Sequence, residues 1–292
     1  MRAPRPRLSR LIAAPLALVS AGLALAACSP LRALDALVPE DGYRLVPNVA
    51  YGDHPRMRFD LYLPEEGTVA APPVLFFHGG SWRSGGKDGY RFVGHAFASR
   101  GVAVAIVEYR LYPDIRYPTF AEDAAAAARR LLELAPEHGL PERVVAMGHS
   151  AGAHTAAALM LEPHYLDGAG VDPDLRAGLI SISGPVYIDP QEYEITRAVF
   201  APVADQPERG RPALHVSADD PPSFIIHGAA DSTVYPINSE KLAAALGAAG
   251  VPAQLELRAE EGHIAPLLAL AHPFEETENP LAARLAEWVR GL

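Results

Sequence analysis

Cysteine is almost absent from this sequence of 292 residues, because Cys28 is the only one. A lone cysteine excludes an intramolecular disulfide, so the stability of the fold must come from packing. Basic charge is also scarce. The chain has 25 Lys and Arg against 35 Asp and Glu, and no basic block occurs beyond the extreme N-terminus. This balance excludes the positive surface of a nucleic-acid-binding protein.

Metal-binding patterns are also missing, since the chain has neither H-E-x-x-H nor a cysteine–histidine arrangement. We therefore expect no metal site and no cofactor. Apolar residues are plentiful by contrast, and their share of 49% is enough for a sizeable core. The composition predicts a globular protein.

The N-terminus has the composition of an export signal. An apolar run from Leu11 to Ala27 follows four arginines, which are Arg2, Arg5, Arg7 and Arg10. This run is marginal as a membrane span and contains Pro15, so we expect residues 1–27 to be a cleaved signal peptide. The run ends in "LAAC", which resembles the lipobox of bacterial lipoproteins. An ordinary cleavage site is the alternative, because Ala24-Leu25-Ala26 also satisfies an A-x-A rule.

The lipobox resemblance implies that Cys28 is lipidated and becomes the mature N-terminus. Multiple acyl chains give stable attachment, so the expected product is an exported, membrane-anchored lipoprotein on the periplasmic or cell-surface side. Residues 28–56 have no recognisable chemistry, and we interpret them as a tether with an N-terminal edge strand. Residues 57–292 are then expected to form the catalytic domain.

Apolar periodicity predicts strands that alternate with helices. Segments that alternate like half-buried strands are Met57–Pro64 and Ala253–Ala259. Continuous apolar runs typical of buried strands are Pro73–Gly80, Val102–Tyr109, Arg143–Gly148, Gly178–Ser183 and Ser223–Gly228. Helices are expected over Ala121–Gly139, Ile237–Gly250 and Asn279–Leu292. This pattern predicts an α/β fold in which helices flank both faces of a mostly parallel central sheet.

The segment 184–222 breaks this rhythm, because it is rich in proline and has weak periodicity. It lies between two predicted core strands, where an α/β enzyme can carry a lid or cap. We therefore expect an insertion there.

The stretch "GHSAG", Gly148 to Gly152, stands where a buried strand passes into a helix of small residues. It matches G-x-S-x-G, in which a serine on a strained turn projects its hydroxyl above the sheet. Glycines two positions away allow the strand and the helix to approach closely. A tight turn with a serine cap is the alternative interpretation of the motif alone.

A serine hydroxyl needs a base and an orienting carboxylate. Asp231 follows the strand that ends at Gly228, and His263 follows the strand that ends at Ala259. The order Ser150, Asp231, His263 predicts a catalytic triad. The competitors are Asp219 and Asp220, which precede their strand, and His272, which lies far beyond the strand end.

Six motifs in order resemble those of the α/β-hydrolase superfamily, specifically bacterial carboxylesterases related to hormone-sensitive lipase and kynurenine formamidase. They cover Asp60 to His263 and are "DLYLP", "HGGSW", "EYRL", "GHSAGAH", "HGAADSTV" and "EGH". The resemblance implies that Ser150 is the nucleophile, that His263 is the general base and then acid, and that Asp231 orients His263.

The resemblance also implies an oxyanion hole formed by backbone N–H groups of Gly80, Ser81 and Ala151, with Gly79 shaping the turn. The hormone-sensitive lipase branch has a third glycine where this chain has Ser81, so the donor assignment in this loop is open by one residue. Trp82 is expected to line the substrate pocket or to pack under the loop. His78 and His149 are expected to support the loop and to flank the nucleophile.

The expected activity is hydrolysis of small or short-chain carboxylic esters through an acyl-enzyme, with a small-molecule ester as substrate. An arylformamidase-like amide hydrolase is one alternative. A noncatalytic binding protein that keeps the hydrolase fold is another, from a different class.

Overall fold

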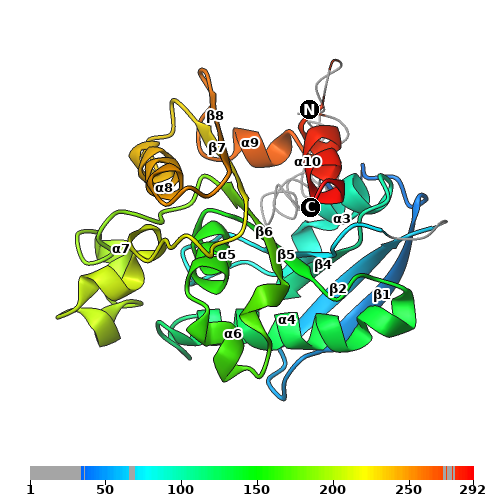
Figure 1. Ribbon diagram of the computed structural model, residues 1–292, viewed down its shortest axis with the longest axis horizontal. Coiled ribbons are helices and arrows are strands. Elements are labelled where there is room, and N and C mark those ends of the chain that lie inside the picture. The colour runs from blue at the N-terminus through cyan, green and yellow to red at the C-terminus, as the bar shows by residue number, and fades with distance from the viewer. Residues whose placement is uncertain (1–33, 36, 66–69, 272–273, 275–277, 279) are drawn as a thin grey trace, which may run out of the picture.

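A mixed β-sheet forms the centre of the computed structural model, which describes residues 34–35, 37–65, 70–271, 274, 278 and 280–292 (Figure 1). Within these residues the sheet has eight strands in the order β1-β2-β4-β3-β5-β6-β7-β8. Strands β3 to β8 pair in parallel, whereas β2 runs antiparallel to both β1 and β4. The bounds are β1 Tyr43–Ala50, β2 Arg58–Pro64, β3 Val74–Phe77, β4 Val104–Glu108, β5 Val144–His149, β6 Arg176–Ile182, β7 Ser223–Gly228 and β8 Ala253–Arg258. The predicted mostly parallel sheet is confirmed.

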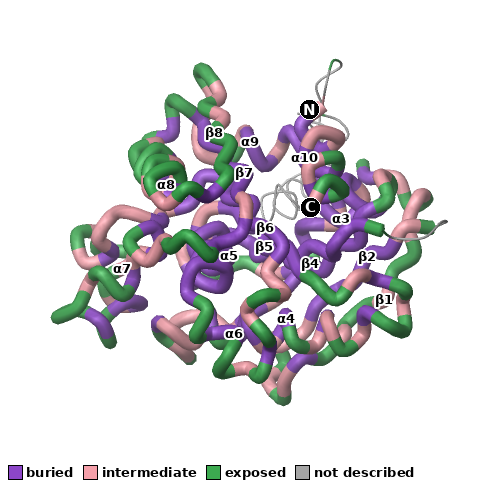
Figure 2. The backbone as a smooth tube through the Cα atoms, in the orientation of Figure 1, coloured by how far each residue is buried: buried purple, intermediate pink, exposed green. Residues whose placement is uncertain are grey.

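Helices cover both faces of this sheet, as the strand–helix alternation predicts (Figure 1). One face packs against α3 Arg91–Ala98, α9 Ala265–Leu268 and α10 Leu281–Arg290. The other face packs against α4 Thr119–His138, α5 Ala151–Leu161, α6 His164–Gly168 and α8 Ile237–Ala248. Successive strand residues alternate between the two cores, so Phe76 joins the first and Phe77 the second. The central strands are therefore buried along their whole length (Figure 2).

Two strands differ in burial although the sequence patterns of both alternate. The prediction of a half-buried strand is wrong for β2, whose residues from Phe59 to Leu63 are all buried. Strands β1 and β4 cover the two edges of β2, and α3 packs against one face. On the other face, Phe59, Leu61 and Leu63 belong to the second core, so β2 has no free face. Strand β8 ends the sheet and is mostly exposed, in agreement with the prediction of an edge position.

The parallel pairing of β3, β5, β6, β7 and β8 brings the carboxyl ends of these strands to one edge of the sheet. The loops after β3, β5, β7 and β8 contain the residues predicted to be functional. The fold therefore gathers segments that are far apart in the sequence.

The segment 184–222 lies between β6 and β7 and contains short helical turns only. These are α7 Glu194–Arg197 and the 3-10 helices η3 Ala201–Val203, η4 Pro207–Gly210 and η5 Pro212–Leu214. Outside this segment, the described chain has the 3-10 helices η1 Lys87–Gly89 and η2 Pro173–Leu175. Side chains of the main fold hold the segment in place. The Asn238 side-chain oxygen accepts the N–H groups of Tyr187 and Ile188, each at 3.0 Å.

The predicted signal peptide and Cys28 lie outside the described residues. Within the described part of the chain, no helix combines the length and the apolar character needed to cross a membrane.

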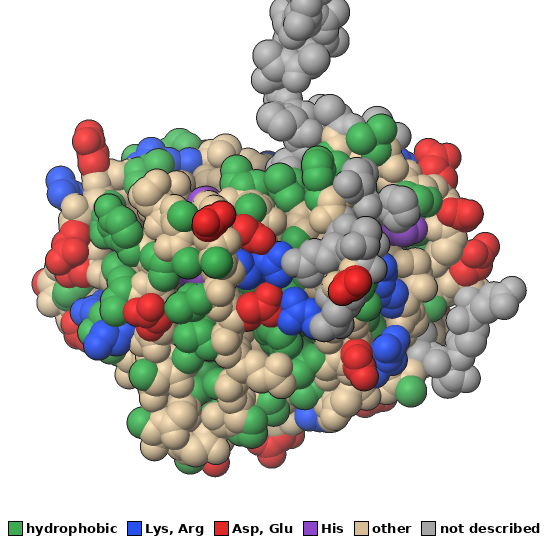
Figure 3. Space-filling model, turned by 90° about the horizontal axis from the view of Figure 1, so that it is seen from above, with side chains coloured by type: hydrophobic (Ala, Val, Ile, Leu, Met, Phe, Trp, Pro, Cys, Tyr) green, Lys and Arg blue, Asp and Glu red, His purple; other side chains and the backbone are tan. Residues whose placement is uncertain are grey.

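Acidic and basic side chains are interspersed on the face shown in Figure 3.

Candidate active site

Ser150 occupies the turn between β5 and α5 in a strained backbone conformation. Its φ of 56° and ψ of −124° place it outside the regions that non-glycine residues usually adopt. The flanking glycines permit this turn. A Cβ atom on Gly148 would lie 2.2 Å from the carbonyl carbon of Gly152, and one on Gly152 would lie 2.0 Å from the Phe77 carbonyl oxygen. The strand and the helix thus approach more closely than any side chain allows.

The structure brings Ser150, His263 and Asp231 together from three loops at the carboxyl edge. The His263 Nε2 atom lies 2.9 Å from Ser150 Oγ, and its Nδ1 atom lies 2.7 Å from Asp231 Oδ2. The Asp231 side chain is fully buried, whereas that of His263 is 15% exposed. A proton can therefore pass from the serine hydroxyl to the imidazole without rearrangement of the side chains.

Asp231 is held as an ionised hydrogen-bond acceptor. Its Oδ1 atom accepts the backbone N–H groups of Thr233 at 2.8 Å and Val234 at 2.9 Å. Burial acts to raise the pKa of Asp231, but the hydrogen bonds from Val234 and His263 outweigh it, so the pKa lies below its ordinary value. The group facing His263 is thus a carboxylate that is fixed on both oxygens.

The competing residues lie elsewhere or cannot be described. Asp220 forms an ion pair with Arg176 at 3.1 Å and accepts the N–H of Ser217 at 2.7 Å, which gives it a structural role. The backbone carbonyl of the neighbouring Asp219 accepts a hydrogen bond from the Arg176 guanidinium at 3.3 Å. His272 lies outside the described residues.

The loop after β3 runs beside the nucleophile. A Cβ atom on Gly79 would lie 3.2 Å from Ser150 Cβ, so this glycine is required for the close approach. The next three residues all have positive φ, namely Gly80 at 121°, Ser81 at 53° and Trp82 at 56°.

Ala151 begins α5, so its N–H has no acceptor within the helix. The predicted donors Gly80, Ser81 and Ala151 thus lie on the two segments that meet at Ser150. Their function as an oxyanion hole stays a prediction, as does the register within the loop.

Two buried histidines and a tyrosine support these segments. The Tyr109 hydroxyl donates to the His78 carbonyl at 2.7 Å, and the His78 ring stacks on Tyr109 with its Nδ1 atom 2.8 Å from the Gly79 carbonyl oxygen. His149 Nε2 lies 2.9 Å from the His263 carbonyl oxygen. Burial lowers the pKa of both histidines to about 4, so they are neutral near pH 7 and suit the supporting roles expected of them.

A cavity of about 130 Å³ opens directly on Ser150. The insertion supplies half of its lining, namely Pro185, Ile188, Pro190, Tyr193, Ile195, Thr196 and Phe200. Trp82 lines the cavity and packs edge-on against Phe200 while only 2% exposed, and its contact with substrate stays a prediction. The lining has no Asp, Glu, Lys or Arg, and burial lowers the pKa of its one histidine, His154, to about 4. The cavity therefore suits an uncharged group.

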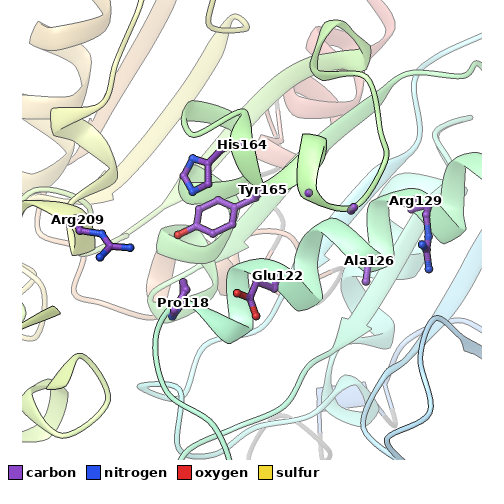
Figure 4. Close-up of a pocket in the computed structure, with 9 residues that line it drawn as sticks. Pro118, Glu122, Ala126, Arg129, His164, Tyr165 and Arg209 are labelled. Atoms are coloured by element: carbon purple, nitrogen blue, oxygen red, sulfur yellow. The ribbon is translucent and has the colours of Figure 1, made fainter. Parts of the chain in front are cut away.

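A larger cavity of about 580 Å³ lies between α4 and α6, away from Ser150. Figure 4 shows His164 and Tyr165 of α6 above Glu122 of α4, with Arg209 reaching in from the insertion. None of the predicted catalytic residues lines it. Among the residues that the structure describes, no group of His, Cys, Asp and Glu could hold a metal ion. The cavity at Ser150 is consequently the candidate active site.

Sequence reasoning missed two contributions to this site. It expected a lid or cap at 184–222 but did not identify which residues of that segment line the cavity, and it gave no role to His227, whose Nε2 atom lies 3.2 Å from Asp231 Oδ2. The spacing of four residues in "HGAAD" was available as a signal for His227. No comparable pattern marks Ile188 or Pro190.

Comparison with known proteins gives matches along most of the chain. A family model described as BD-FAE matches residues 59–170, and one described as the prolyl oligopeptidase family matches residues 119–272. The chain is 29% identical over 240 residues to a probable isoprenylcysteine alpha-carbonyl methylesterase of Oryza sativa subsp. japonica, covering 74% of this chain and 57% of that protein. The chain spans about half the length of the curated methylesterases that it matches.

Two further similar proteins have other names. Kynurenine formamidase of Danio rerio is 26% identical over 223 residues, which are 74% of this chain and 73% of that protein. Inhibited esterase B of Lactobacillus rhamnosis is a solved structure with a TM-score of 0.71 and 25% identity over 94% of each chain. Because the prolyl oligopeptidase family model covers more than half of the sequence, the protein belongs to that family. The α/β-hydrolase superfamily that the motifs predict is confirmed.

Proposed function

We propose that the protein is a serine esterase that hydrolyses carboxylic esters through an acyl-enzyme on Ser150. The observation that carries this proposal is the unbroken hydrogen-bond chain from Ser150 through His263 to the buried Asp231. The family is named for a peptidase, but the relatives described above are named as esterases and a formamidase. The arrangement suits acyl transfer from an ester.

The reaction follows from the positions of the three side chains. Ser150 Oγ bonds to the carbonyl carbon while its proton passes to His263 Nε2, and a tetrahedral oxyanion forms. The imidazolium, stabilised by Asp231, then protonates the leaving alcohol as the ester C–O bond breaks. Water attacks the acyl-enzyme, with His263 again taking the proton, and the acid and free Ser150 are released.

The loop after β3 and the start of α5 supply the N–H groups for the developing oxyanion. Their rigid support by Tyr109 and His78 suits this role, because preorganised donors stabilise the transition state without reorganisation. Loss of one such donor typically lowers turnover about 10²- to 10³-fold.

The cavity beside Ser150 favours a short, uncharged acyl group. A cavity of about 150 Å³ holds benzene, so one of about 130 Å³ admits an acyl group of about four to six carbon atoms. The alcohol is then expected at the open side, near Thr233 and Val234.

An arylformamidase-like activity is the second candidate, favoured by the match to kynurenine formamidase over 74% of this chain. The same acyl-transfer chemistry would cleave an N-formyl bond. Turnover of p-nitrophenyl butyrate compared with N-formylkynurenine distinguishes the two. We expect kcat/KM to be higher for the ester, and the reverse order would replace the first proposal by the second.

Covalent labelling tests the nucleophile. We expect a fluorophosphonate to modify wild-type protein at Ser150 and to leave Ser150→Ala unlabelled, with ester hydrolysis lost in the variant. A folded wild-type protein that neither reacts nor hydrolyses any ester of two to eight carbons would overturn the proposal and favour a noncatalytic binding protein.

Export and lipid attachment at Cys28 are part of the proposed function and are supported by the sequence of the N-terminal segment alone. Metabolic labelling with palmitate in a bacterial host tests them. We expect label in the membrane fraction for the wild type and none for Cys28→Ser. Equal labelling of the two proteins would contradict the assignment.

A further inference from the structure

His227 is a fully buried histidine directly behind the candidate catalytic carboxylate. It is the penultimate residue of β7, four residues before Asp231, and is 0% exposed. It does not line the cavity beside Ser150, so it has no route to substrate. The steps proposed above do not use it.

The contacts of His227 define which ring nitrogen carries a proton. Nε2 lies 2.8 Å from the Val234 carbonyl oxygen and 3.2 Å from Asp231 Oδ2. Both neighbours are acceptors, so Nε2 must carry hydrogen. Nδ1 lies 2.7 Å from Ser239 Oγ, and in the neutral ring this unprotonated nitrogen accepts a hydrogen bond from the Ser239 hydroxyl.

With this tautomer, the single Nε2–H donates to the Val234 carbonyl at 2.8 Å and is shared with Asp231 Oδ2, which lies farther away at 3.2 Å. Oδ1 accepts two backbone N–H groups, from Thr233 and Val234, while Oδ2 lies between the rings of His263 and His227. Because the second donor on Oδ2 comes from a rigid strand end, it opposes rotation of the carboxylate about its side-chain bonds.

We propose that His227 is a positioning residue that holds the Asp231 carboxylate in the plane required by His263, with Ser239 selecting its tautomer. The inference rests on the proposed function of the same site. It extends the chain of polar contacts to five side chains, from Ser239 on α8 to the nucleophile, in the order Ser239, His227, Asp231, His263, Ser150, with the 3.2 Å contact between His227 and Asp231 as its longest link.

The neutrality of His227 is essential to this role. A second imidazolium beside Asp231 would repel the positive charge that develops on His263 during attack. Burial lowers the pKa of His227, and the remaining titratable groups near it are Asp231 and His263, together with the buried His149. His227 therefore gives Asp231 a hydrogen bond without adding charge.

Two substitutions separate positioning from packing. His227→Leu keeps an apolar side chain of moderate size but loses both ring nitrogens. His227→Gln keeps an N–H₂ group near the place of Nε2 and so retains a donor toward Asp231 and Val234. We expect the Leu variant to lose about 10- to 100-fold in kcat, the effect of a hydrogen bond to a charged group, with little change in KM. The Gln variant should recover most of this loss.

The pH profile gives a readout that packing would not move. Without the donor on Oδ2, the charge of Asp231 acts more strongly on His263 and favours its protonated form. The low-pH limb of kcat/KM should therefore shift to higher pH by about half a unit or more in His227→Leu, and not in His227→Gln.

Matched controls come from the same elements. Phe224→Leu removes buried volume from the opposite end of β7, where Phe224 contacts Trp288, and should lower Tm without shifting the pH profile. Ser239→Ala should lower kcat about 2- to 5-fold, because the tautomer of His227 is then no longer fixed. Ser223 is a buried serine at the far end of β7, and Ser223→Ala should leave kcat unchanged.

The outcomes separate this inference from the proposed function. If wild-type protein hydrolyses no ester and Ser150 takes no fluorophosphonate, the proposed function fails. If the wild type is active and folded His227→Leu retains wild-type kcat and pH profile, the positioning role is overturned. Equal losses of kcat in the Leu and Gln variants with an unshifted low-pH limb would also overturn it.

Discussion

Ser150 has a left-handed φ of 56°, and the residues around it make this conformation possible. The strained turn lifts the hydroxyl above the sheet, toward a histidine that belongs to another loop. Gly148 and Gly152 provide the space, because any Cβ there would meet backbone atoms that cannot move aside. Backbone strain and reactivity are therefore linked at one residue.

Substitution of Gly152 tests this link. In Gly152→Ala the new methyl group would meet the Phe77 carbonyl oxygen, which belongs to β3. We expect destabilisation by about 1–3 kcal/mol and at least a 100-fold loss of fluorophosphonate labelling rate, because β3 or Ser150 must shift. Gly168→Ala on α6 is the control, since no atom lies within 4 Å of its new methyl group. Normal labelling of folded Gly152→Ala would contradict the steric account.

Glu162 is an ionisable residue whose burial costs stability. It is 6% exposed, and its Oε1 atom has no hydrogen-bond partner among the described residues. Burial raises its pKa to about 8, whereas the unfolded chain ionises near 4.5. Between these values the folded state binds more protons, so the free energy of unfolding falls as pH rises.

Glu162→Gln should therefore stabilise the protein more at pH 9 than at pH 5. We expect the gain in Tm to be larger by about 3 °C or more at the higher pH, which thermal unfolding in matched buffers measures. A gain that is equal at both pH values would show that Glu162 does not carry this proton linkage.

At the scale of elements, the insertion 184–222 determines the shape of the candidate active site. Its turns have little regular structure, and contacts with α5 and α8 hold them in place. His154 Nε2 lies 2.9 Å from the Gly210 carbonyl oxygen, and the Asn238 side chain accepts two N–H groups of the insertion. The cavity wall is thus as rigid as the helices that support it.

Ile188 should control the length of the acyl group. Its side chain is half-buried and lines the cavity, so Ile188→Ala enlarges the space beside Ser150. We expect the preferred p-nitrophenyl ester to lengthen by about two carbons, because the lost atoms approximate that volume. Val203→Ala, buried in the same insertion but absent from the cavity lining, should leave the preference unchanged. An unaltered chain-length profile for Ile188→Ala would contradict this assignment.

The elements also show how far sequence reasoning reaches. Continuous apolar runs predicted β3 to β7 because a buried parallel strand leaves that pattern by itself. The predicted strand ends also located the loops that carry Ser150, Asp231 and His263. The burial of β2 and the wall containing Ile188 depend on neighbours distant in the chain, such as β4 and Asn238, and no local pattern records those contacts.

At the scale of the whole molecule, buried neutral histidines make the fold sensitive to acid. Burial lowers the pKa of His78, His149 and His154 to about 4, against 6.5 in the unfolded chain. Between these values the unfolded state binds more protons. Their contribution to stability is therefore present above about pH 6.5 and is lost as pH falls toward 4.

Urea unfolding at pH 7.0, 5.5 and 4.5 measures this loss. Each of these histidines should lower the free energy of unfolding at pH 4.5 by on the order of 2 kcal/mol relative to pH 7.0. Their sum outweighs the opposite gain from the single Glu162. His154→Gln, which keeps a donor toward Gly210, should flatten the dependence. Stability that is constant from pH 7.0 to 4.5 would refute the linkage.

Strand β8 ends the sheet, so one row of its backbone N–H and C=O groups has no neighbouring strand. Leu255 and Leu257 are 38% and 42% exposed on this strand, while Glu256 pairs with Arg284 and Arg258. Charged side chains at an exposed edge disfavour the addition of a strand from another molecule. We therefore expect these charges to oppose fibrillar self-association, although they take no part in ester chemistry, and two of them, Glu256 and Arg258, lie on the strand that leads to His263.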